Sequence, residues 1–292
     1  MNLLLPAVVS GIAVGMLYGL LAFATVVLFK ATGTVNFAQG SMGALSAFVT
    51  WRLLTNHGVN TALAVVTGLA FSILLGVVTY QVSIRFRDRG DATNAIVRTL
   101  ALSLLFTALI DRLWGAGQPF QFPQLLTSGG MSVAGVQVSY AALETLGIAA
   151  VLLAGFGLLF RFTDFGLLTR AMADSREVTR LLGVPNRRLA TVIWGITAAL
   201  GTVVALLSAH TLFLSTSMMD SYLLYGFTAA IAFGLNSLTG AIIGGLVVGL
   251  ISNVVSTYQG SDWANILMFA VLVAILIIRP QGLLGRAEVR RV

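Results

Sequence analysis

Long apolar runs, broken by short polar or glycine-containing stretches, follow one another along almost the whole chain. An uncharged apolar run of about 20 residues is long enough to cross a lipid bilayer as a helix. The pattern predicts helical spans at about residues 6–29, 34–54, 61–84, 97–115, 139–160, 189–213, 221–236, 240–258 and 264–280. Because the seventh is short, the pattern is compatible with either eight or nine crossings. Broken or re-entrant segments in place of some spans are a further alternative. The predicted fold class is all-α, a polytopic integral membrane helical bundle.

Composition supports this class. The 292 residues are 58% hydrophobic and 9% charged, with a mean hydropathy of +0.95, whereas soluble domains carry about 25% charged residues. We expect a single transmembrane domain over residues 1–292. The absence of cysteine excludes thiolate chemistry, and the two histidines, His57 and His210, lie too far apart in sequence to predict a metal site.

The basic residues divide unequally between the two sides of the predicted membrane. With nine crossings, 15 of the 17 lie on one side and only Arg52 and Arg112 on the other. Cytoplasmic loops collect Lys and Arg, so we predict the N-terminus outside and the C-terminus in the cytoplasm. The bilayer then accounts for the net charge of +7 without nucleic acid. The larger group is Lys30, Arg85, Arg87, Arg89, Arg98, Arg161, Arg170, Arg176, Arg180, Arg187, Arg188, Arg279, Arg286, Arg290 and Arg291.

Glycines at helical spacing predict a tightly packed bundle. Gly11, Gly15 and Gly19 leave one face of the first span nearly bare, and a neighbouring helix can approach it closely. A second such set lies in the eighth span, at Gly240, Gly244, Gly245 and Gly249.

Two polar interruptions of the apolar sequence resemble each other. They are NFAQGSMGA (36–44) and LNSLTGAII (235–243). Transporters often bind substrate at such paired interruptions near the middle of the membrane.

Motifs of several enzyme classes are absent from the sequence. Lys30, in LFKATG, is the only lysine, so no GK[ST] phosphate loop is present and the chain is not expected to hydrolyse ATP by that route. HExxH, GxSxG and paired catalytic carboxylates are absent as well. We therefore do not expect an enzyme.

A proton-driven transporter would need buried titratable residues. The best candidate is Glu144, which alternatively lies at the membrane interface or pairs with a basic residue such as Arg112.

The longest predicted cytoplasmic loop, about residues 161–188, concentrates charge in this apolar chain. Its centre predicts a short amphipathic helix that ends at LLGVP, because Gly183 suits a C-cap and Pro185 does not readily continue a helix. This helix either lies on anionic headgroups or docks a soluble partner, and the acids among its arginines favour docking. Its apolar side would consist of Met172, Val178, Leu181 and Leu182.

Four stretches resemble, in order, the motifs of one known family. The loop fits A-x(2)-D-x(6)-LLGV-x(3)-R, which is similar to the cytoplasmic motif of ABC importer permeases. TVNFAQGSMGALSAFV (34–49) resembles the INFAHGE region of branched-chain amino acid permeases. FGLNSLTGAIIGGLVVG (233–249) resembles their GGxGSxxGAxxGG segment, and RPQGLLGRAEV (279–289) their RPxGLFG ending. The sequence is identified as a member of the branched-chain amino acid ABC transporter permease family, nearer its shorter LivH-type subunit.

The resemblance implies a permease subunit of an ABC importer in the bacterial cytoplasmic (inner) membrane, carrying a small polar solute such as a branched-chain amino acid. It implies a second homologous permease, two ATP-binding subunits that bind ATP and Mg, an extracytoplasmic solute-binding protein and surrounding lipid, with no cofactor in this chain. Departures at Gln39, Ser41, Phe233 and Asn236 leave the solute open. The residues implied to couple to the ATPases are Asp174, Arg176, Glu177, Arg180, Leu182, Gly183 and Val184.

Polar residues of the two interruptions form the candidate substrate path. Their amides and hydroxyls can hydrogen-bond a polar solute without a charge that would trap it. Hydrogen bonding between helices is the alternative. A passive channel or facilitator for a solute such as urea or an amide, and a non-transporting scaffold, also remain open. The candidate residues are Asn36, Gln39, Ser41, Asn236, Ser237 and Thr239.

Overall fold

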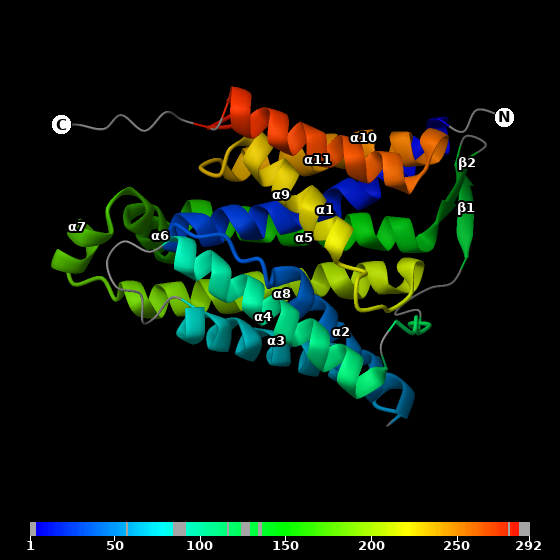
Figure 1. The fold of residues 1–292 in the computed structure, drawn as a ribbon, viewed down its shortest axis with the longest axis horizontal. Helices are drawn as coiled ribbons and strands as arrows, with labels where there is room; N and C mark the ends of the chain where they lie inside the picture. Colours follow the sequence, from blue (N-terminus) through cyan, green and yellow to red (C-terminus); the bar gives the residue numbers. More distant parts are fainter. Residues whose placement is uncertain are drawn as a thin grey trace. The chain divides into compact units, whose positions relative to one another are not determined.

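Each of the nine predicted spans is a helix in the computed structural model (Figure 1). The structure describes residues 4–56, 58–83, 92–115, 117–123, 129–133, 136–279 and 281–285. The helices at the predicted spans are α1 (Leu4–Thr32), α2 (Gln39–Asn56), α3 (Thr61–Ser83), α4 (Ala92–Trp114), α5 (Tyr140–Phe162), α8 (Asn186–Leu212), α9 (Asp220–Phe233), α10 (Leu238–Gln259) and α11 (Ser261–Ile278). His57, Arg85, Arg87, Arg89, Arg286, Arg290 and Arg291 lie outside the described residues.

Seven helices within the described ranges are long and apolar enough to cross a membrane: α1, α3, α4, α5, α8, α10 and α11. The other two predicted spans differ from these. α2 is rich in Gly, Ser and Thr, and α9 has 14 residues, which at 1.5 Å per residue extend about 21 Å across a hydrocarbon core of about 30 Å. The number of crossings above seven therefore stays a prediction.

Two helices and two strands of the described residues have no counterpart among the predicted spans of the sequence. The predicted cytoplasmic loop contains α6 (Asp164–Asp174) and α7 (Arg176–Leu181). Before α5, strands β1 (Gly130–Val133) and β2 (Val136–Ser139) form an antiparallel hairpin in which Gly130 pairs with Ser139. The hairpin was not predicted.

The chain folds into two compact units, each assembled from separate stretches. Unit 1 contains residues 1–26, 126–158 and 221–292, and unit 2 contains residues 27–125 and 159–220. A single permease domain over residues 1–292 stays a prediction.

In unit 1, the two predicted glycine sets pack against each other. A Cβ placed on Gly245 would meet the backbone of Gly19, and one on Gly249 would meet the backbone of Gly15. The backbones of α1 and α10 therefore touch, which confirms the prediction of close packing. Beside this contact, the hydroxyl of Tyr225 in α9 donates to Oδ1 of Asn265 in α11 at 2.7 Å.

In unit 2, α8 packs against both α2 and α3 (Figure 1). A Cβ on Gly43 of α2 would stand 2.7 Å from the carbonyl oxygen of Gly201 in α8. Between α8 and α3, Oγ1 of Thr202 donates to Oγ of Ser72 at 2.6 Å. Short side chains thus let three helices approach closely, with Trp194 fully buried in α8.

Candidate functional site

The segment before α2 is a turn closed by its own side chain. Oδ1 of Asn36 accepts the backbone N–H of Ala38 at 3.0 Å, and the N–H of Phe37 donates to Oγ1 of Thr99 in α4 at 3.4 Å. A side-chain acceptor of this kind competes with helical hydrogen bonding. Residues 34–38 are therefore not helical, and the helix start predicted at residue 34 is wrong.

The three candidate path residues at the start of α2 are buried within unit 2. The exposed fractions are 2% for Asn36, 1% for Gln39 and 9% for Ser41. Nδ2 of Asn36 lies 3.7 Å from Sδ of Met42, and the Ser41 hydroxyl donates to the carbonyl of Ala38 at 3.1 Å. Asn36 and Ser41 thus have partners inside the protein.

Gln39 differs from its neighbours because its side-chain amide has no partner. Neither Nε2 nor Oε1 is hydrogen-bonded. The side chain packs against α8, where a Cβ on Gly201 would stand 3.3 Å from Cγ of Gln39 and 3.8 Å from Nε2. A buried polar group left unpaired costs about 1–3 kcal/mol. Such a group in a native fold requires an explanation, such as a functional role or a bound molecule.

The other candidate path residues lie in unit 1, at the link between α9 and α10. Asn236 and Thr239 are exposed, and Ser237 is half-buried. Ser237 is the N-cap of α10, where its hydroxyl accepts the N–H of Gly240 at 3.0 Å and lies 3.3 Å from Oγ1 of Thr239. The structure therefore brings Ser237 and Thr239 together at a helix cap.

The C-terminal segment, residues 281–285, packs on this link. The backbone N–H of Leu283 donates to the carbonyl of Ala232 at 2.8 Å, and that of Leu284 donates to the carbonyl of Phe233 at 3.2 Å. These carbonyls belong to the last turn of α9, where helical partners are missing. The segment thus supplies donors to the end of α9.

Glycine allows this contact. Gly234 has φ +106°, a conformation that side chains rarely adopt, and a Cβ on it would stand 2.7 Å from Cα of Gly285. Two of the stretches that carry the family resemblance, 233–249 and the described part of 279–289, therefore meet in unit 1. Sequence reasoning missed this pairing, although the glycines at 234, 282 and 285 were a signal for it.

The six candidate path residues are thus divided equally between the two units. Each group is local to one link between helices. Their union in one path stays a prediction.

The predicted cytoplasmic loop folds as two helices instead of one. Ser175 separates α6 from α7, with an extended backbone (φ −156°, ψ 110°) and a side-chain oxygen that accepts the N–H of Val178 at 3.2 Å. Met172 is 1% exposed in α6, whereas Val178, Leu181 and Leu182 are exposed. The prediction that Met172 shares their side is wrong, because the break at Ser175 interrupts the helical periodicity.

The end of α7 is as predicted. The N–H of Gly183 donates to the carbonyl of Arg180 at 3.1 Å, and that of Val184 donates to the carbonyl of Thr179 at 3.0 Å. Gly183 has φ +79°. This is a Schellman motif, and the C-cap role of Gly183 is confirmed.

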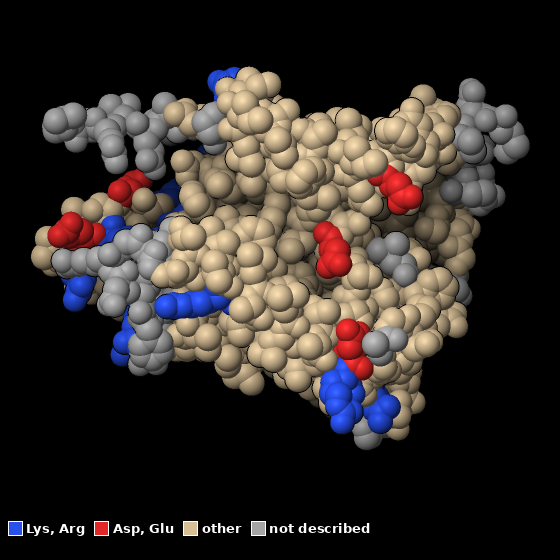
Figure 2. Space-filling model, viewed as in Figure 1, with Lys and Arg blue, Asp and Glu red and all other residues tan. Residues whose placement is uncertain are grey.

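α7 presents an exposed surface of mixed character. The exposed fractions are 53% for Val178, 82% for Leu181 and 75% for Leu182. Acidic and basic side chains lie around the α6–α7 end of unit 2 (Figure 2). An exposed apolar patch rimmed by polar residues is typical of an interaction site. We name as the α7 surface the exposed residues Asp174, Glu177, Val178, Arg180, Leu181 and Leu182. Arg176 is exposed as well, and its guanidinium lies close to Gly33.

α7 is fastened to α8 through Asn186, which sequence reasoning missed. Nδ2 of Asn186 donates to the carbonyl of Arg176 at 2.9 Å and to Oγ1 of Thr179 at 3.0 Å. In the sequence only its position after Pro185, at the first turn of a helix, was a signal.

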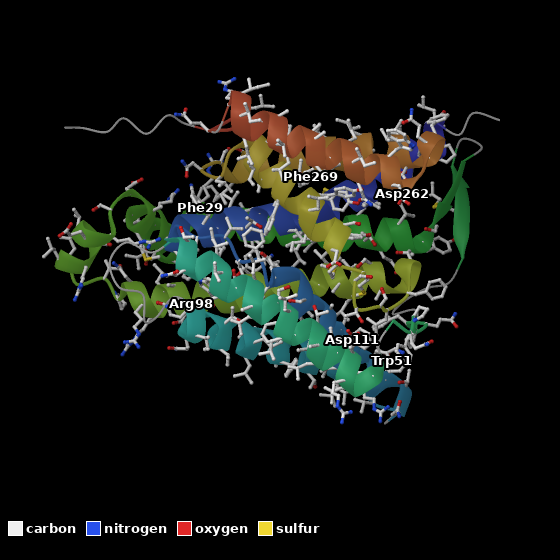
Figure 3. All side chains as sticks on the ribbon, in the orientation of Figure 1. Phe29, Trp51, Arg98, Asp111, Asp262 and Phe269 are labelled. Carbon is white, nitrogen blue, oxygen red and sulfur yellow. The ribbon has the colours of Figure 1, made fainter. Side chains whose placement is uncertain are left out.

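Charged residues lie at both ends of unit 2 (Figure 2). Arg98 lies toward the end that carries α6 and α7, whereas Trp51 and Asp111 lie toward the other (Figure 3). Arg52 and Arg112, the two basic residues predicted on the opposite side from all others, are the sequence neighbours of Trp51 and Asp111. The membrane orientation itself stays a prediction. In the described part of the chain, no three His, Cys, Asp or Glu side chains gather where they could hold a metal ion.

Comparison with known proteins identifies the relatives of this chain. Residues 7–276 match the family described as branched-chain amino acid transport system / permease component. The permease protein BraD of the high-affinity branched-chain amino acid transport system of Pseudomonas aeruginosa is 26% identical, over 99% of this chain and 98% of BraD. The high-affinity branched-chain amino acid transport system permease protein LivH of Escherichia coli K12 is 25% identical, over 97% of this chain and 96% of LivH. The fructose import permease FruF of Bifidobacterium longum is 23% identical over 86% and 71%.

One solved structure shows the same fold. PsaBC from Streptococcus pneumoniae, in complex with a Fab, matches with a TM-score of 0.55 at 14% identity, over 96% of this chain and 93% of the other. With its apolar helices and these relatives, the chain is a multi-pass membrane protein.

Proposed function

Because this chain belongs to the family of permease components of branched-chain amino acid transport systems, we propose that it is the transmembrane permease subunit of an ABC importer. It forms half of a translocation path for a small polar solute, such as a branched-chain amino acid. A second homologous permease forms the other half, and a solute-binding protein delivers the solute from outside. The chain lies in a bacterial inner membrane with its C-terminus in the cytoplasm.

Two cytoplasmic subunits bind ATP and Mg and drive the cycle. The chain itself has no GK[ST] phosphate loop, so in this proposal the energy enters through a contact with another protein. ATP shifts the permease between two packings by binding one of them more tightly.

The observation that carries this proposal is the exposed α7 surface. Leu181 and Leu182 stand out from a helix that is capped at both ends and fastened to α8. A short rigid helix with apolar tips and flanking charges suits a groove on a soluble partner. The alternative for α7 is the anionic membrane surface.

The candidate solute path uses Asn36, Gln39 and Ser41 from unit 2 and Asn236, Ser237 and Thr239 from unit 1. Gln39 is the strongest of these candidates, because its amide is buried and unpaired.

The decisive experiment replaces the apolar tips of α7. The double variant Leu181→Ser/Leu182→Ser should weaken co-purification of the ATP-binding subunits by about 10-fold or more, because each buried leucine contributes about 1.5–3 kcal/mol to an interface. Leu167→Ser is the matched control, since Leu167 is also exposed (57%) but lies in α6.

The outcomes separate the candidate functions. Loss of the ATP-binding subunits from the double variant but not from the control supports docking. If the unaltered chain purifies alone from mild detergent and from lipid nanodiscs, and transports solute in vesicles without ATP, it is a facilitator. Equal retention of ATP-binding subunits by both variants would assign α7 to the lipid surface.

A further inference from the structure

Arg176 is held at the junction of α7 and α8 by its backbone. It is the first residue of α7, directly after the N-cap Ser175. Its carbonyl oxygen accepts a hydrogen bond from Nδ2 of Asn186 at 2.9 Å, and Oγ1 of Thr179 lies 3.1 Å from it. Any displacement of α7 relative to α8 therefore acts on Arg176 directly.

The side chain of Arg176 extends to a different part of unit 2. Its Nη2 lies 3.3 Å from the position that a Cβ on Gly33 would occupy, and Cζ lies 3.9 Å from it. Gly33 follows the last residue of α1. Arg176 is exposed, as Leu181 and Leu182 are, but its guanidinium lies close to Gly33.

Gly33 begins the α1–α2 linker, residues 33–38, in which buried and half-buried residues alternate after Gly33. Thr34 and Asn36 are each 2% exposed. The linker is held by hydrogen bonds from Phe37 to Thr99 and from Ala38 to Asn36. A segment that is packed and internally bonded in this way moves as a piece, because protein interiors transmit strain. Directly after it comes Gln39, whose amide is buried and unpaired.

We propose that Arg176 is a positioning residue that transmits displacement of α7 to the α1–α2 linker and so to Asn36 and Gln39. This inference rests on the proposed function, and it names the route by which docking at α7 reaches the candidate solute path within unit 2. The α7 surface contacts the ATP-binding subunit, while Arg176, on the same helix, contacts the linker.

The first test measures coupling in the assembled transporter, reconstituted with its ATP-binding subunits. Solute transported per ATP hydrolysed should fall at least about fivefold in Arg176→Ala, the lower end of usual allosteric couplings. Arg176→Lys keeps the positive charge but not the planar guanidinium, so its ratio should lie between those of Arg176→Ala and the unaltered chain. Arg170→Ala is the matched control, because Nη2 of Arg170 donates to the carbonyl of Arg161 at 3.5 Å and not to the linker.

The second test follows the linker without solute. The chain has no cysteine. Val35→Cys, at a half-buried linker position, therefore introduces the only thiol of this chain. Its rate of modification by a maleimide should change when ATP is added to the transporter, and the further change Arg176→Ala should abolish that response. Arg170→Ala should leave it intact.

The two tests distinguish a failure of the proposed function from a failure of the role proposed for Arg176. If the unaltered chain assembles with no ATP-binding subunits, the proposed function fails and the inference with it. If it assembles and couples, but Arg176→Ala keeps both the transport ratio and the ATP-dependent labelling, the positioning role is overturned and the proposed function stands.

Discussion

The α1–α2 linker and the α9–α10 link have similar sequences and different structures. Both contain an asparagine, a small polar residue and glycine beside a helix start, in NFAQGSMGA and LNSLTGAII. Asn36 is 2% exposed and closes its own turn, whereas Asn236 is exposed. Neighbouring helices cover the α1–α2 linker, whereas the segment of residues 281–285 packs on the α9–α10 link.

The two links differ in how their backbone groups are hydrogen-bonded, more than in their polar residue types. In the α1–α2 linker a side chain satisfies the backbone, and the amide of Gln39 is left unpaired. In the α9–α10 link the backbone of Leu283 and Leu284 satisfies the end of α9, and Ser237 caps α10. Buried polar groups must find partners, and the two links find them in different ways.

The largest expected effect is on the α9–α10 link, from Gly234→Val. A β-branched residue at φ +106° is strained, and its Cβ would collide with the backbone of Gly285. The free energy of unfolding should fall by about 3 kcal/mol or more, measured by thermal unfolding of the purified chain. Gly155→Val is the control, since a Cβ there meets nothing within 4 Å. Equal loss in both variants would contradict the role of the Gly234 contact.

The next effect separates the two asparagines. Asn36→Ala leaves the buried N–H of Ala38 without its acceptor, so stability should fall by about 1–3 kcal/mol. Asn236→Ala, at an exposed position, should stay within about 0.5 kcal/mol. Urea denaturation in detergent compares the two, and uptake by the assembled transporter tests their place in the path. Unchanged uptake kinetics in both variants would remove both residues from it.

Gln39→Leu should raise the stability of the protein and lower its solute uptake. The change removes an unpaired buried amide and keeps most of the side-chain volume, so stability should rise by about 1–2 kcal/mol. Uptake should fall, because the amide is the polar group that the solute would meet. Ser41→Ala is the control, since its hydroxyl already has an acceptor, and it should bring no stabilisation. A stabilised Gln39→Leu transporter with normal uptake would exclude Gln39 from the path.

The smallest effect is expected for Ser237→Ala. Loss of the N-cap of α10 should cost about 1 kcal/mol, seen as a lower midpoint of thermal unfolding. Ser237→Asp should retain most of the stability, because a carboxylate also accepts the N–H of Gly240. If the Asp variant were as unstable as the Ala variant, capping would not be what Ser237 contributes.

Much of the fold follows from hydropathy alone. All nine predicted spans are helices, because apolar runs of this length satisfy their backbones internally as helices in lipid. The end of α7 at Gly183 was equally local and equally predictable. The start of α2 was not, since it depends on the Asn36 side chain taking the N–H of Ala38.

The candidate sites were predicted less completely. The loop sequence indicated a helix with apolar residues, but the N-cap at Ser175 divides it and assigns Met172 to the interior. Period counting cannot detect such a break, because Ser is compatible with both a helix and its cap. The approach of the exposed Arg176 side chain to Gly33 joins positions that lie 143 apart in the chain (176 − 33).

The sequence by itself determined the membrane helices, the asymmetry of basic residues, the family resemblance and the residue types of the candidate path. These are properties of single segments, governed by transfer to lipid and local hydrogen bonding. Only the tertiary structure decided that Gln39 is buried unpaired against Gly201, that the C-terminal segment closes α9, and that Leu182 faces outward while Arg176 reaches the linker. Each of these depends on which distant backbone comes close enough to cover or to pair a polar group, and that is settled by packing.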